Sequence, residues 1–480
     1  MRFALISEDL HMIFSSYRFI FAFFPIVFGG YTILRLLKKP LLTKIWLVLA
    51  SLAFYAFGQL DFFPIFLGTI IFNYACVYFM HRFEDKHPLH VLFFLLSVFE
   101  NIGLLLYYKY TNFFIDNINR IAKTDIQFLN LILPIGISFF TFQILAYSVS
   151  VFKDKLKPAN PLDYSLFITF FPQLVVGPIV MHEEILPQIR DSELIAFDKN
   201  NVIRGILLFS IGAAKKIIIA NPLITYAQNY YFGGFNEGGT TAAWFGMLAF
   251  TFAYYFDFSG YIDMARGIGY LFGIKLPINF NSPYKAESFA DFWRRWNMTV
   301  SGFFDKTVFA SLFGFGDGFV KLFFATVITF LVSGLWHGSA WHFVAWGLFN
   351  GILVAISNIL TLHGFRMKKA IGCSVTFIVM MLGRVLFDAR NTGEALLIYK
   401  KLFSFTDPLQ NIGSFVSENA YTAVLLILSA LICFCFKNSN EICDGEDKVF
   451  GVRHAIAAAF LLVLALVNMS SVSTFLYFSF

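Results

Sequence analysis

Two long apolar segments meet at Ser333-Gly334-Leu335-Trp336-His337-Gly338-Ser339-Ala340-Trp341, with no charged linker between them. The segment before this junction covers Phe319–Leu335, and the segment after it covers Trp341–Leu360. A helix needs about 20 mainly apolar residues to cross the hydrocarbon core of a bilayer. Because neither segment alternates apolar and polar residues as barrel strands do, both are predicted to be membrane-spanning helices.

The same pattern recurs along the whole chain. Its 480 residues are 58% hydrophobic and only 14% charged, whereas soluble domains are about 25% charged. The mean hydropathy is +0.69, so most residues face lipid or a buried helical interior. We therefore predict an all-α polytopic membrane protein with roughly ten to thirteen transmembrane helices. The other apolar runs are Phe19–Leu34, Ile45–Leu60, Phe62–Met80, Leu89–Tyr108, Phe128–Phe152, Tyr164–Val180, Val202–Leu223, Trp244–Phe258, Ala370–Phe387, Ala423–Phe436 and Ala455–Tyr477.

The net charge of +6 lies in loops beside the ends of the apolar runs. The loop between Arg35 and Lys44 is rich in basic residues, which is typical of cytoplasmic loops. The sequence has no basic soluble domain of the kind that binds nucleic acid, so that class of partner is excluded. The first residues include Glu8 and Asp9 instead of a basic region, so no cleavable signal peptide is expected, and Met12 is the more natural membrane N-terminus.

Two polar stretches interrupt the apolar pattern. Asp191–Asn201 is predicted to be a polar connection between spans. Lys275–Lys306 mixes charged and polar residues with aromatic ones, and from Glu287 onward the aromatic spacing is that of a helix. This second stretch is predicted to be an amphipathic or re-entrant segment lodged against the membrane. The alternative is an interfacial helix that only anchors the chain through its aromatic and arginine side chains.

His337 is the first candidate for a catalytic role. An ionisable side chain at membrane depth is costly and points to function. Histidine titrates near neutral pH, so it can accept a proton from an attacking hydroxyl. Gly334 and Gly338 beside it let backbone or substrate approach closely. The alternative is a structural histidine that hydrogen-bonds to a neighbouring helix.

Other ionisable residues receive structural interpretations. His342 lies off the helical face of His337, and His182 is interpreted as a residue at the membrane edge. Asp257 and Asp263, beside an apolar run, are interpreted as carboxylates paired with a base such as Lys109 or Arg266. No metal site is predicted, because no second ligand stands at a suitable spacing from any histidine. The five cysteines also lack such a spacing; they are Cys76, Cys373, Cys433, Cys435 and Cys443.

Short motifs follow one another in a set order from Phe14-Ser15-Ser16-Tyr17-Arg18-Phe19 to about Phe403. The most specific are Phe292-Trp293-Arg294-Arg295-Trp296 and Leu335-Trp336-His337-Gly338. The others include Lys109-Tyr110-Thr111-Asn112-Phe113-Phe114, Leu133-Pro134-Ile135-Gly136-Ile137-Ser138-Phe139-Phe140-Thr141-Phe142-Gln143, Phe171-Pro172-Gln173-Leu174, Gly177-Pro178-Ile179, Lys215-Lys216 and Asp257-Phe258-Ser259-Gly260-Tyr261. In this order and spacing the chain resembles the membrane-bound O-acyltransferase (MBOAT) family, in the branch typified by the alginate O-acetylation protein AlgI.

The resemblance implies a fold in which transmembrane helices and re-entrant segments surround a central tunnel. It implies one integral membrane domain over residues 1–480, with a core at about 14–403 and C-terminal helices in 404–480. It also implies a multi-pass protein of the cell inner (cytoplasmic) membrane, in contact with membrane lipids.

The resemblance further implies a reaction, the O-acetylation of an extracytoplasmic polysaccharide or cell-wall glycan. An acetyl thioester made in the cytoplasm, with acetyl-CoA as the implied donor, would deliver its acetyl group across the membrane, and no bound cofactor is expected. Relatives pass the group to an extracytoplasmic SGNH-type acetyltransferase partner. The chain has no soluble catalytic domain of its own, which agrees with a need for such a partner.

The resemblance assigns roles to individual residues. His337 matches the family's essential histidine and becomes the favoured base or acyl-transfer residue. Asn297 stands where a second histidine is usual, and an asparagine there can hydrogen-bond a substrate but cannot act as a proton-transfer base. Trp293, Arg294, Arg295 and Trp336 are expected to help bind substrate. Three further departures from the family pattern are Ser150, Met181 and Asp388.

Three other functions remain open at this point. The nearest is D-alanyl transfer to teichoic acid, a reaction of a related branch that shares the histidine motif. A transporter for a lipid or glycan precursor would use His337 as a proton relay, but transporters often contain paired broken segments, and Lys275–Lys306 has no counterpart in the other half. The third is a non-catalytic scaffold, which the substitution at Asn297 keeps open.

Overall fold

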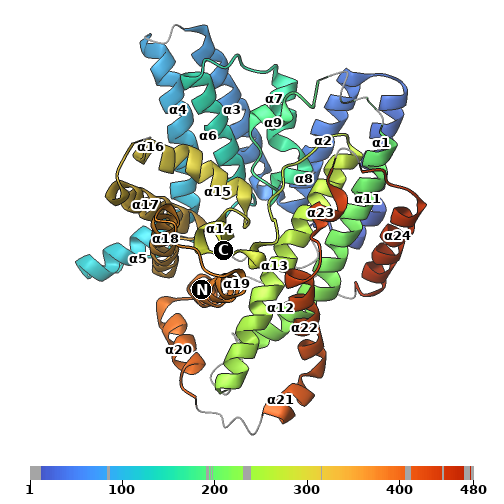
Figure 1. Cartoon of the computed structure of the whole chain (residues 1–480). Coiled ribbons are helices and arrows are strands. Elements are labelled where there is room, and N and C mark those ends of the chain that lie inside the picture. The colour runs from blue at the N-terminus through green and yellow to red at the C-terminus, as the bar shows by residue number, and fades with distance from the viewer. Residues whose placement is uncertain are drawn as a thin grey trace.

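Figure 1 shows the chain as a computed structural model in which helices of very different length pack around a central region. The structure describes residues 12–83, 87–190, 194, 196, 198–230, 239–314, 316–405, 412–445, 448–469 and 476. Within these residues every regular element is a helix, which confirms the predicted all-helical class. The N-terminal features at Glu8 and Asp9, and much of the polar stretch Asp191–Asn201, lie outside the described residues.

Seven helices in the described part are long and apolar enough to cross a membrane, or eight if a bent pair counts as one span. The chain is therefore a multi-pass membrane protein. This number is smaller than the ten to thirteen crossings predicted from the apolar runs. The seven are η1 (Phe19–Phe23) with α1 (Phe24–Leu36), α2 (Pro40–Gly58), η2 (Leu60–Phe62) with α3 (Phe63–Arg82), α4 (Pro88–Leu105) with η3 (Leu106–Tyr110) and α5 (Thr111–Ala122), α17 (Phe319–His337), α18 (Trp341–Leu362) and α19 (Lys369–Asp388).

The difference arises because several apolar runs are broken. After α7 (Pro161–Thr169), Phe170 leaves the helical region with φ −47° and ψ 107°, and the short helix α8 (Phe171–Leu174) begins directly behind it. The run Phe128–Phe152 is helical only in α6 (Ile137–Lys153). Gly136 caps that helix at φ +73°, a left-handed conformation that favours glycine. Apolar composition alone therefore overestimates the number of spans.

Other apolar runs belong to helices that carry buried charges. Figure 1 shows α12 and α13 running side by side through the molecule. Lys215 Nζ lies 2.6 Å from Asp263, and Lys216 pairs with Asp257. Arg266, one of the two expected partners for these carboxylates, instead bonds to Asn440 and Asp444. The helices concerned are α11 (Lys199–Ala214), η4 (Lys215–Ala220), α12 (Asn221–Asn229) and α13 (Thr240–Leu271).

Helices α11 and α13 pack backbone to backbone. A Cβ atom built on Gly267 would lie 2.6 Å from the carbonyl oxygen of Gly205, and one built on Gly212 would lie 2.4 Å from the carbonyl oxygen of Gly260. Small residues allow this approach, and membrane helices rely on such contacts because lipid tails are as apolar as the side chains.

The α17–α18 hairpin uses the same principle. A Cβ atom on Gly334 would lie 2.4 Å from the carbonyl oxygen of Phe343, and one on Gly347 would lie 2.5 Å from that of Phe330. The two helices are therefore held in contact on either side of the junction that contains His337. Figure 1 places this hairpin beside α14 and α15.

The segment Lys275–Lys306 lies between the longer helices as a series of short elements. Phe292 and Trp296 are buried, and their rings stack at 5.5 Å. This placement agrees with the predicted lodged segment and not with a surface anchor. Its elements are η6 (Pro283–Lys285), α14 (Phe289–Trp293), α15 (Met298–Phe304) and η7 (Asp305–Phe309).

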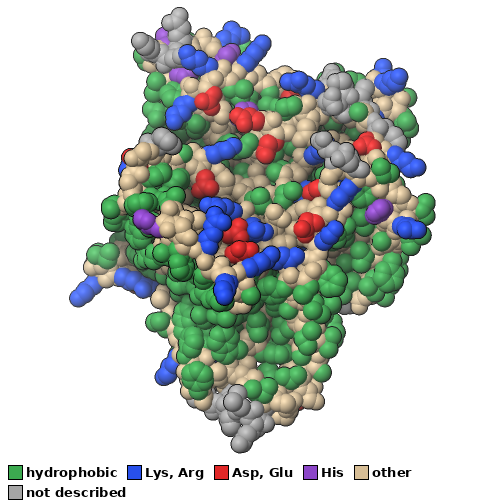
Figure 2. All heavy atoms as spheres, in the orientation of Figure 1, with side chains coloured by type: hydrophobic (Ala, Val, Ile, Leu, Met, Phe, Trp, Pro, Cys, Tyr) green, Lys and Arg blue, Asp and Glu red, His purple; other side chains and the backbone are tan. Residues whose placement is uncertain are grey.

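The surface divides into apolar and charged regions. Figure 2 shows charged side chains over the upper and central parts of the visible face, and apolar side chains over its lower part.

The C-terminal α21 and α22 form the bent pair, with an angle of 93°. The remaining helices are α9 (His182–Ile185), α16 (Ala310–Leu312), α20 (Thr392–Leu402), α21 (Ile412–Glu418), α22 (Ala420–Phe434), α23 (Ser439–Cys443) and α24 (Val452–Val467).

We predict that Gly267→Ala destabilises the protein. The added methyl group would meet the backbone of Gly205, so α11 and α13 must separate. Overpacking of this kind typically lowers stability by about 1–3 kcal/mol. Thermal unfolding of the purified protein in detergent measures the change. Gly68→Ala on α3 is the matched control, because nothing lies within 4 Å of its added atom; an equal loss in both variants would contradict the packing argument.

Candidate functional site

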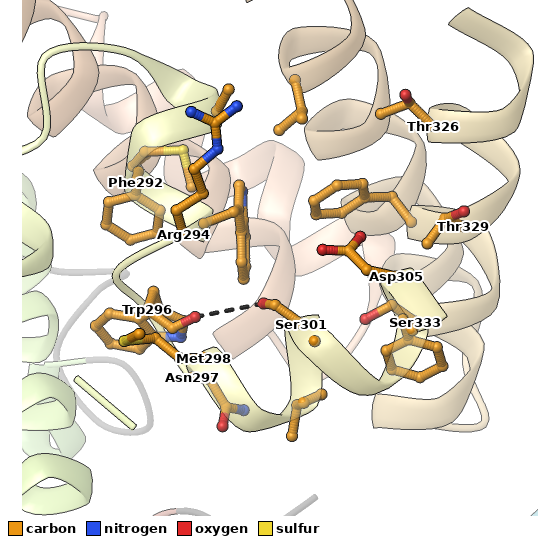
Figure 3. A pocket seen from close by; sticks show the side chains of 18 of the residues that line it. Phe292, Arg294, Trp296, Asn297, Met298, Ser301, Asp305, Thr326, Thr329 and Ser333 are labelled. Carbon is orange, nitrogen blue, oxygen red and sulfur yellow. Dashed lines mark hydrogen bonds between the residues drawn. The ribbon is translucent and has the colours of Figure 1, made fainter. Parts of the chain in front are cut away.

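A cavity of about 840 Å³ opens between the short elements of Lys275–Lys306 and the longer helices α13, α17, α18 and α19. This volume is in the range of sites that take small-molecule ligands. Figure 3 shows part of its wall, with side chains from several elements turned toward a common space. The aromatic members of the lining include Tyr254, Phe258, Tyr284, Phe292, Trp293, Trp296, Phe304, Phe330, Trp346 and Phe387.

His337 lines this cavity from the last residue of α17. Its imidazole is enclosed by aromatic rings, with centroids 5.2 Å from Trp346 and 5.2 Å from Phe387. The next residue, Gly338, leaves the helix in an extended conformation. A Cβ atom on Gly338 would overlap the ring of Phe343, so a larger residue at this exit would have to displace that ring. The helix therefore ends with the histidine at the cavity wall.

The C-terminal end of α17 is held by the Lys109-Tyr110 motif. The last carbonyl groups of a helix have no partners within the helix. Here Lys109 Nζ donates to the carbonyl oxygen of Trp336, and the Tyr110 hydroxyl donates to that of Leu335 at 2.6 Å. A cation at this position is also favoured by the helix dipole. These two contacts position the backbone directly before His337.

Asn297 also lines the cavity, between α14 and α15. Its backbone is left-handed, with φ 45° and ψ 52°, a conformation that asparagine tolerates better than most residues. Its Oδ1 accepts a hydrogen bond from Asn279 Nδ2 at 3.0 Å. The oxygen of Asn279 in turn accepts from both the backbone and the hydroxyl of Thr299. The carboxamide of Asn297 is therefore fixed, with its NH₂ group as the remaining donor.

The structure separates the four predicted binding residues into two pairs. Trp293 and Arg294 line the cavity, and the Arg294 side chain is exposed. Arg295 is outside the lining and pairs with Asp291 at 2.9 Å. Trp336 is also outside it, packed on Phe142 with ring centroids 5.2 Å apart.

A polar stripe on α17 leads along the cavity to His337. Figure 3 shows Thr326, Thr329 and Ser333 following one another along this helix, and Asp305 also lines the cavity. The stripe was missed in the sequence because it lies within an apolar run. Spacings of three and four residues place it on one helical face. Burial raises the pKa of the Asp305 carboxyl, and the positive charge of Arg294 opposes that rise.

Arg384 on α19 is a second feature that the sequence did not reveal. It lines the cavity and forms a side-on ion pair with Asp388, with Nε–Oδ2 at 2.9 Å and Nη2–Oδ1 at 2.8 Å. Its guanidinium carbon lies 3.3 Å from the ring centroid of Tyr254. The signal that could have revealed the pair is the spacing of two opposite charges by four residues in an apolar run.

Two other histidines lie outside the cavity lining. His342 shares a hydrogen bond of 3.0 Å with the carbonyl of Leu386 through Nδ1, so it ties α18 to α19. His182 is buried beside Tyr147, and this burial lowers its pKa. Among the residues that the structure describes, no three His, Cys, Asp or Glu side chains are placed to hold a metal ion.

The arrangement suits proton transfer in a largely apolar cavity. The His337 imidazole lines the cavity together with fixed hydrogen-bond donors at Asn297 and Arg384. Against apolar walls, such donors act more strongly than in bulk water on any charge that develops during a reaction.

Comparison of the sequence with known proteins identifies the family of the chain. Residues 75–386 match the membrane-bound O-acyltransferase family. The chain is 36% identical to a peptidoglycan O-acetyltransferase of Helicobacter pylori, over 98% of both chains. It is 32% identical to the "Probable alginate O-acetylase AlgI" of Pseudomonas aeruginosa, over 82% of this chain and 75% of that protein. A teichoic acid D-alanyltransferase of Bacillus subtilis is 31% identical, over 48% of this chain and 60% of that protein.

The matched residues 75–386 contain both specific motifs and the junction of the two apolar segments. Because the match covers well over half of the chain and two relatives exceed 30% identity over more than two thirds of it, the predicted family is confirmed. The chain belongs to the membrane-bound O-acyltransferase family and is an O-acyltransferase.

Proposed function

We propose that this chain is an O-acetyltransferase that carries acetyl groups from a cytoplasmic thioester to hydroxyl groups of peptidoglycan or a related envelope polysaccharide. The similarity to a peptidoglycan O-acetyltransferase along nearly the whole of both chains supports this acceptor class. The observation that carries the mechanism is the shared cavity, because it brings the histidine motif and the segment around Asn297 to one space.

His337 is the base in this proposal. It accepts the proton of the acceptor hydroxyl while the hydroxyl oxygen bonds to the thioester carbonyl carbon. When the tetrahedral intermediate collapses, the carbon–sulfur bond breaks and the proton passes from His337 to the leaving thiolate. The products are an acetyl ester and a free thiol. Lys109 and Tyr110 contribute by holding the backbone before His337 in place.

The donor enters from the cytoplasmic side, and acetyl-CoA is the donor we propose. The volume and aromatic lining of the cavity fit a thioester on a long flexible arm. We assign the binding of this arm to Asn297, Trp293 and Arg294, because all three line the cavity. Arg295 and Trp336 are outside the cavity lining, so we assign them to supporting the site. A re-entrant segment that borders the cavity is consistent with a ring of helices around a central tunnel.

The proposed location and partner of the protein follow from the transfer of acetyl groups out of the cytoplasm. We propose that the protein lies in the cytoplasmic membrane and that its acetyl group reaches the polymer directly or through an extracytoplasmic SGNH-type acetyltransferase partner. D-alanyl transfer to teichoic acid is the second candidate. The D-alanyltransferase relative covers 48% of this chain, compared with 98% for the peptidoglycan enzyme, which favours acetyl transfer.

We predict that His337→Ala abolishes acetyl transfer. A general base typically contributes about 10²–10⁴ to a rate, so ester should fall to the background of cells without the protein. Alkali-released acetate from purified peptidoglycan, at matched membrane levels of protein, measures this. His363→Ala is the control, because His363 is exposed at the end of α18. Equal acetate in wild type and His337→Ala would contradict the role of His337, and released D-alanine would support the second candidate.

We predict that Asn297→Asp lowers the transfer rate while the protein remains folded. Aspartate keeps the oxygen that accepts from Asn279 but removes the NH₂ donor. The loss of one hydrogen bond to a charged or charge-developing group corresponds to about 10–100-fold in rate. The measurement is the initial rate of acetate transfer in membranes. Asn468→Asp, at the exposed end of α24, is the matched control. A rate within about two-fold of wild type would remove Asn297 from the donor site.

A further inference from the structure

Arg384, a partly buried cation in the cavity wall, has no part in the transfer step described above. It lines the cavity together with His337, and its side chain is only 14% exposed. The other arginine of the described lining, Arg294, is exposed, and Lys109 is outside the lining. A charged side chain on a membrane-spanning helix is costly to bury, so its presence at a reaction cavity calls for a functional explanation.

The guanidinium of Arg384 is fixed in one orientation. Asp388 accepts from Nε and Nη2, so the Nη1 edge is directed away from the carboxylate. The face of Tyr254 lies 3.3 Å from the guanidinium carbon, and Phe250 lies at 5.8 Å. An ion pair and aromatic contacts therefore hold this group before any substrate binds.

The Phe387 ring contacts both Arg384 and the proposed base, His337. The His337 ring lies 5.2 Å from the Phe387 ring, and the guanidinium carbon of Arg384 lies 5.3 Å from the same ring. Both groups therefore contact the same side chain of the cavity wall.

We propose that Arg384 is a further catalytic residue, whose Nη1 edge donates hydrogen bonds to the oxyanion formed during acyl transfer. The inference rests on the proposed function. As the hydroxyl oxygen bonds to the thioester carbon, the carbonyl electron pair moves to the carbonyl oxygen, and the hydroxyl proton moves to His337. Arg384 stabilises the resulting negative charge until the carbonyl re-forms and the thiolate leaves with the proton.

This assignment predicts an effect on the transition state and little effect on donor binding. Removing one donor from an oxyanion site typically lowers kcat by about 10²–10³. A group that acts only in the transition state lowers kcat and leaves KM nearly unchanged. Asp388 is a positioning residue in this scheme, because it touches Arg384 and not the reacting atoms.

The test measures kcat and KM for acetyl-CoA in open membrane fragments, with labelled acetate transferred to peptidoglycan. Arg384→Lys keeps the positive charge but loses the planar guanidinium, which can bond to Asp388 and to the oxyanion at the same time. This variant should lower kcat by about 10²–10³ and keep KM within about two-fold of wild type. The control is Arg390→Lys. Arg390 forms a similar pair with Glu394 four residues on, but outside the cavity lining, and its kcat should match wild type.

A charge-swapped pair separates catalysis from stability. Arg384→Asp with Asp388→Arg restores an ion pair but moves the guanidinium by one helical turn. We expect a wild-type melting temperature with the same loss of kcat. If the swap does not fold, Arg384→Gln with Asp388→Asn keeps a neutral pair of similar size, and it must show the same loss. Wild-type kcat in Arg384→Lys, the swap or the neutral pair would overturn the inference.

His337→Ala, measured in the same membranes, distinguishes a failure of the proposed transfer mechanism from a failure of the Arg384 role alone. If His337→Ala keeps its activity, the proposed transfer mechanism fails and the oxyanion role of Arg384 fails with it. If His337→Ala is inactive and Arg384→Lys is fully active, only the role of Arg384 is wrong. Loss of activity in both, with unchanged KM in Arg384→Lys, supports both.

Discussion

Polar groups at membrane depth have to find partners within the protein, because lipid tails offer no hydrogen bonds. The last carbonyl groups of α17 illustrate this constraint, because a helix offers them no internal partners. Lys109 and Tyr110, which belong to η3, donate hydrogen bonds to two of these carbonyl groups. A helix can therefore end inside the molecule, and the residue at that end is His337. The position of the proposed base thus depends on how the chain satisfies its own backbone hydrogen bonds.

The same constraint explains the paired charges. Lys216 with Asp257, and Arg384 with Asp388, are ion pairs within the described helices. Buried pairs of this kind add little net stability, but breaking one leaves a buried charge that is strongly unfavourable. Lys216 and Asp257 join two helices of the scaffold. Arg384 and Asp388 share one helix, so their pairing does not join elements and is better explained by the cavity that Arg384 faces.

Two departures from the family pattern have structural explanations. Asn297 stands where the resemblance to the family implies a histidine, and here its left-handed backbone and its bond to Asn279 suit an asparagine. A proton-accepting group is then present at His337 and absent at Asn297, which is consistent with one base and one hydrogen-bonding residue. Asp388 stands where an arginine is common, and here it holds Arg384 one helical turn earlier. For Ser150 and Met181 the structure offers no explanation.

Sequence alone determined the membrane class and the family, because these depend on local composition and on ordered motifs around Trp293 and Trp336. It also indicated His337 as the candidate base. It also indicated that Lys275–Lys306 lodges against the membrane. It overestimated the number of spans, since breaks such as the one at Phe170 depend on packing and not on hydropathy. Only the tertiary structure decided that Arg294 faces the cavity while Arg295 does not, and that Arg384 joins His337 there. The physical reason is direction: adjacent residues in the turn after α14 point to different sides, and residues far apart in sequence meet only when their helices pack.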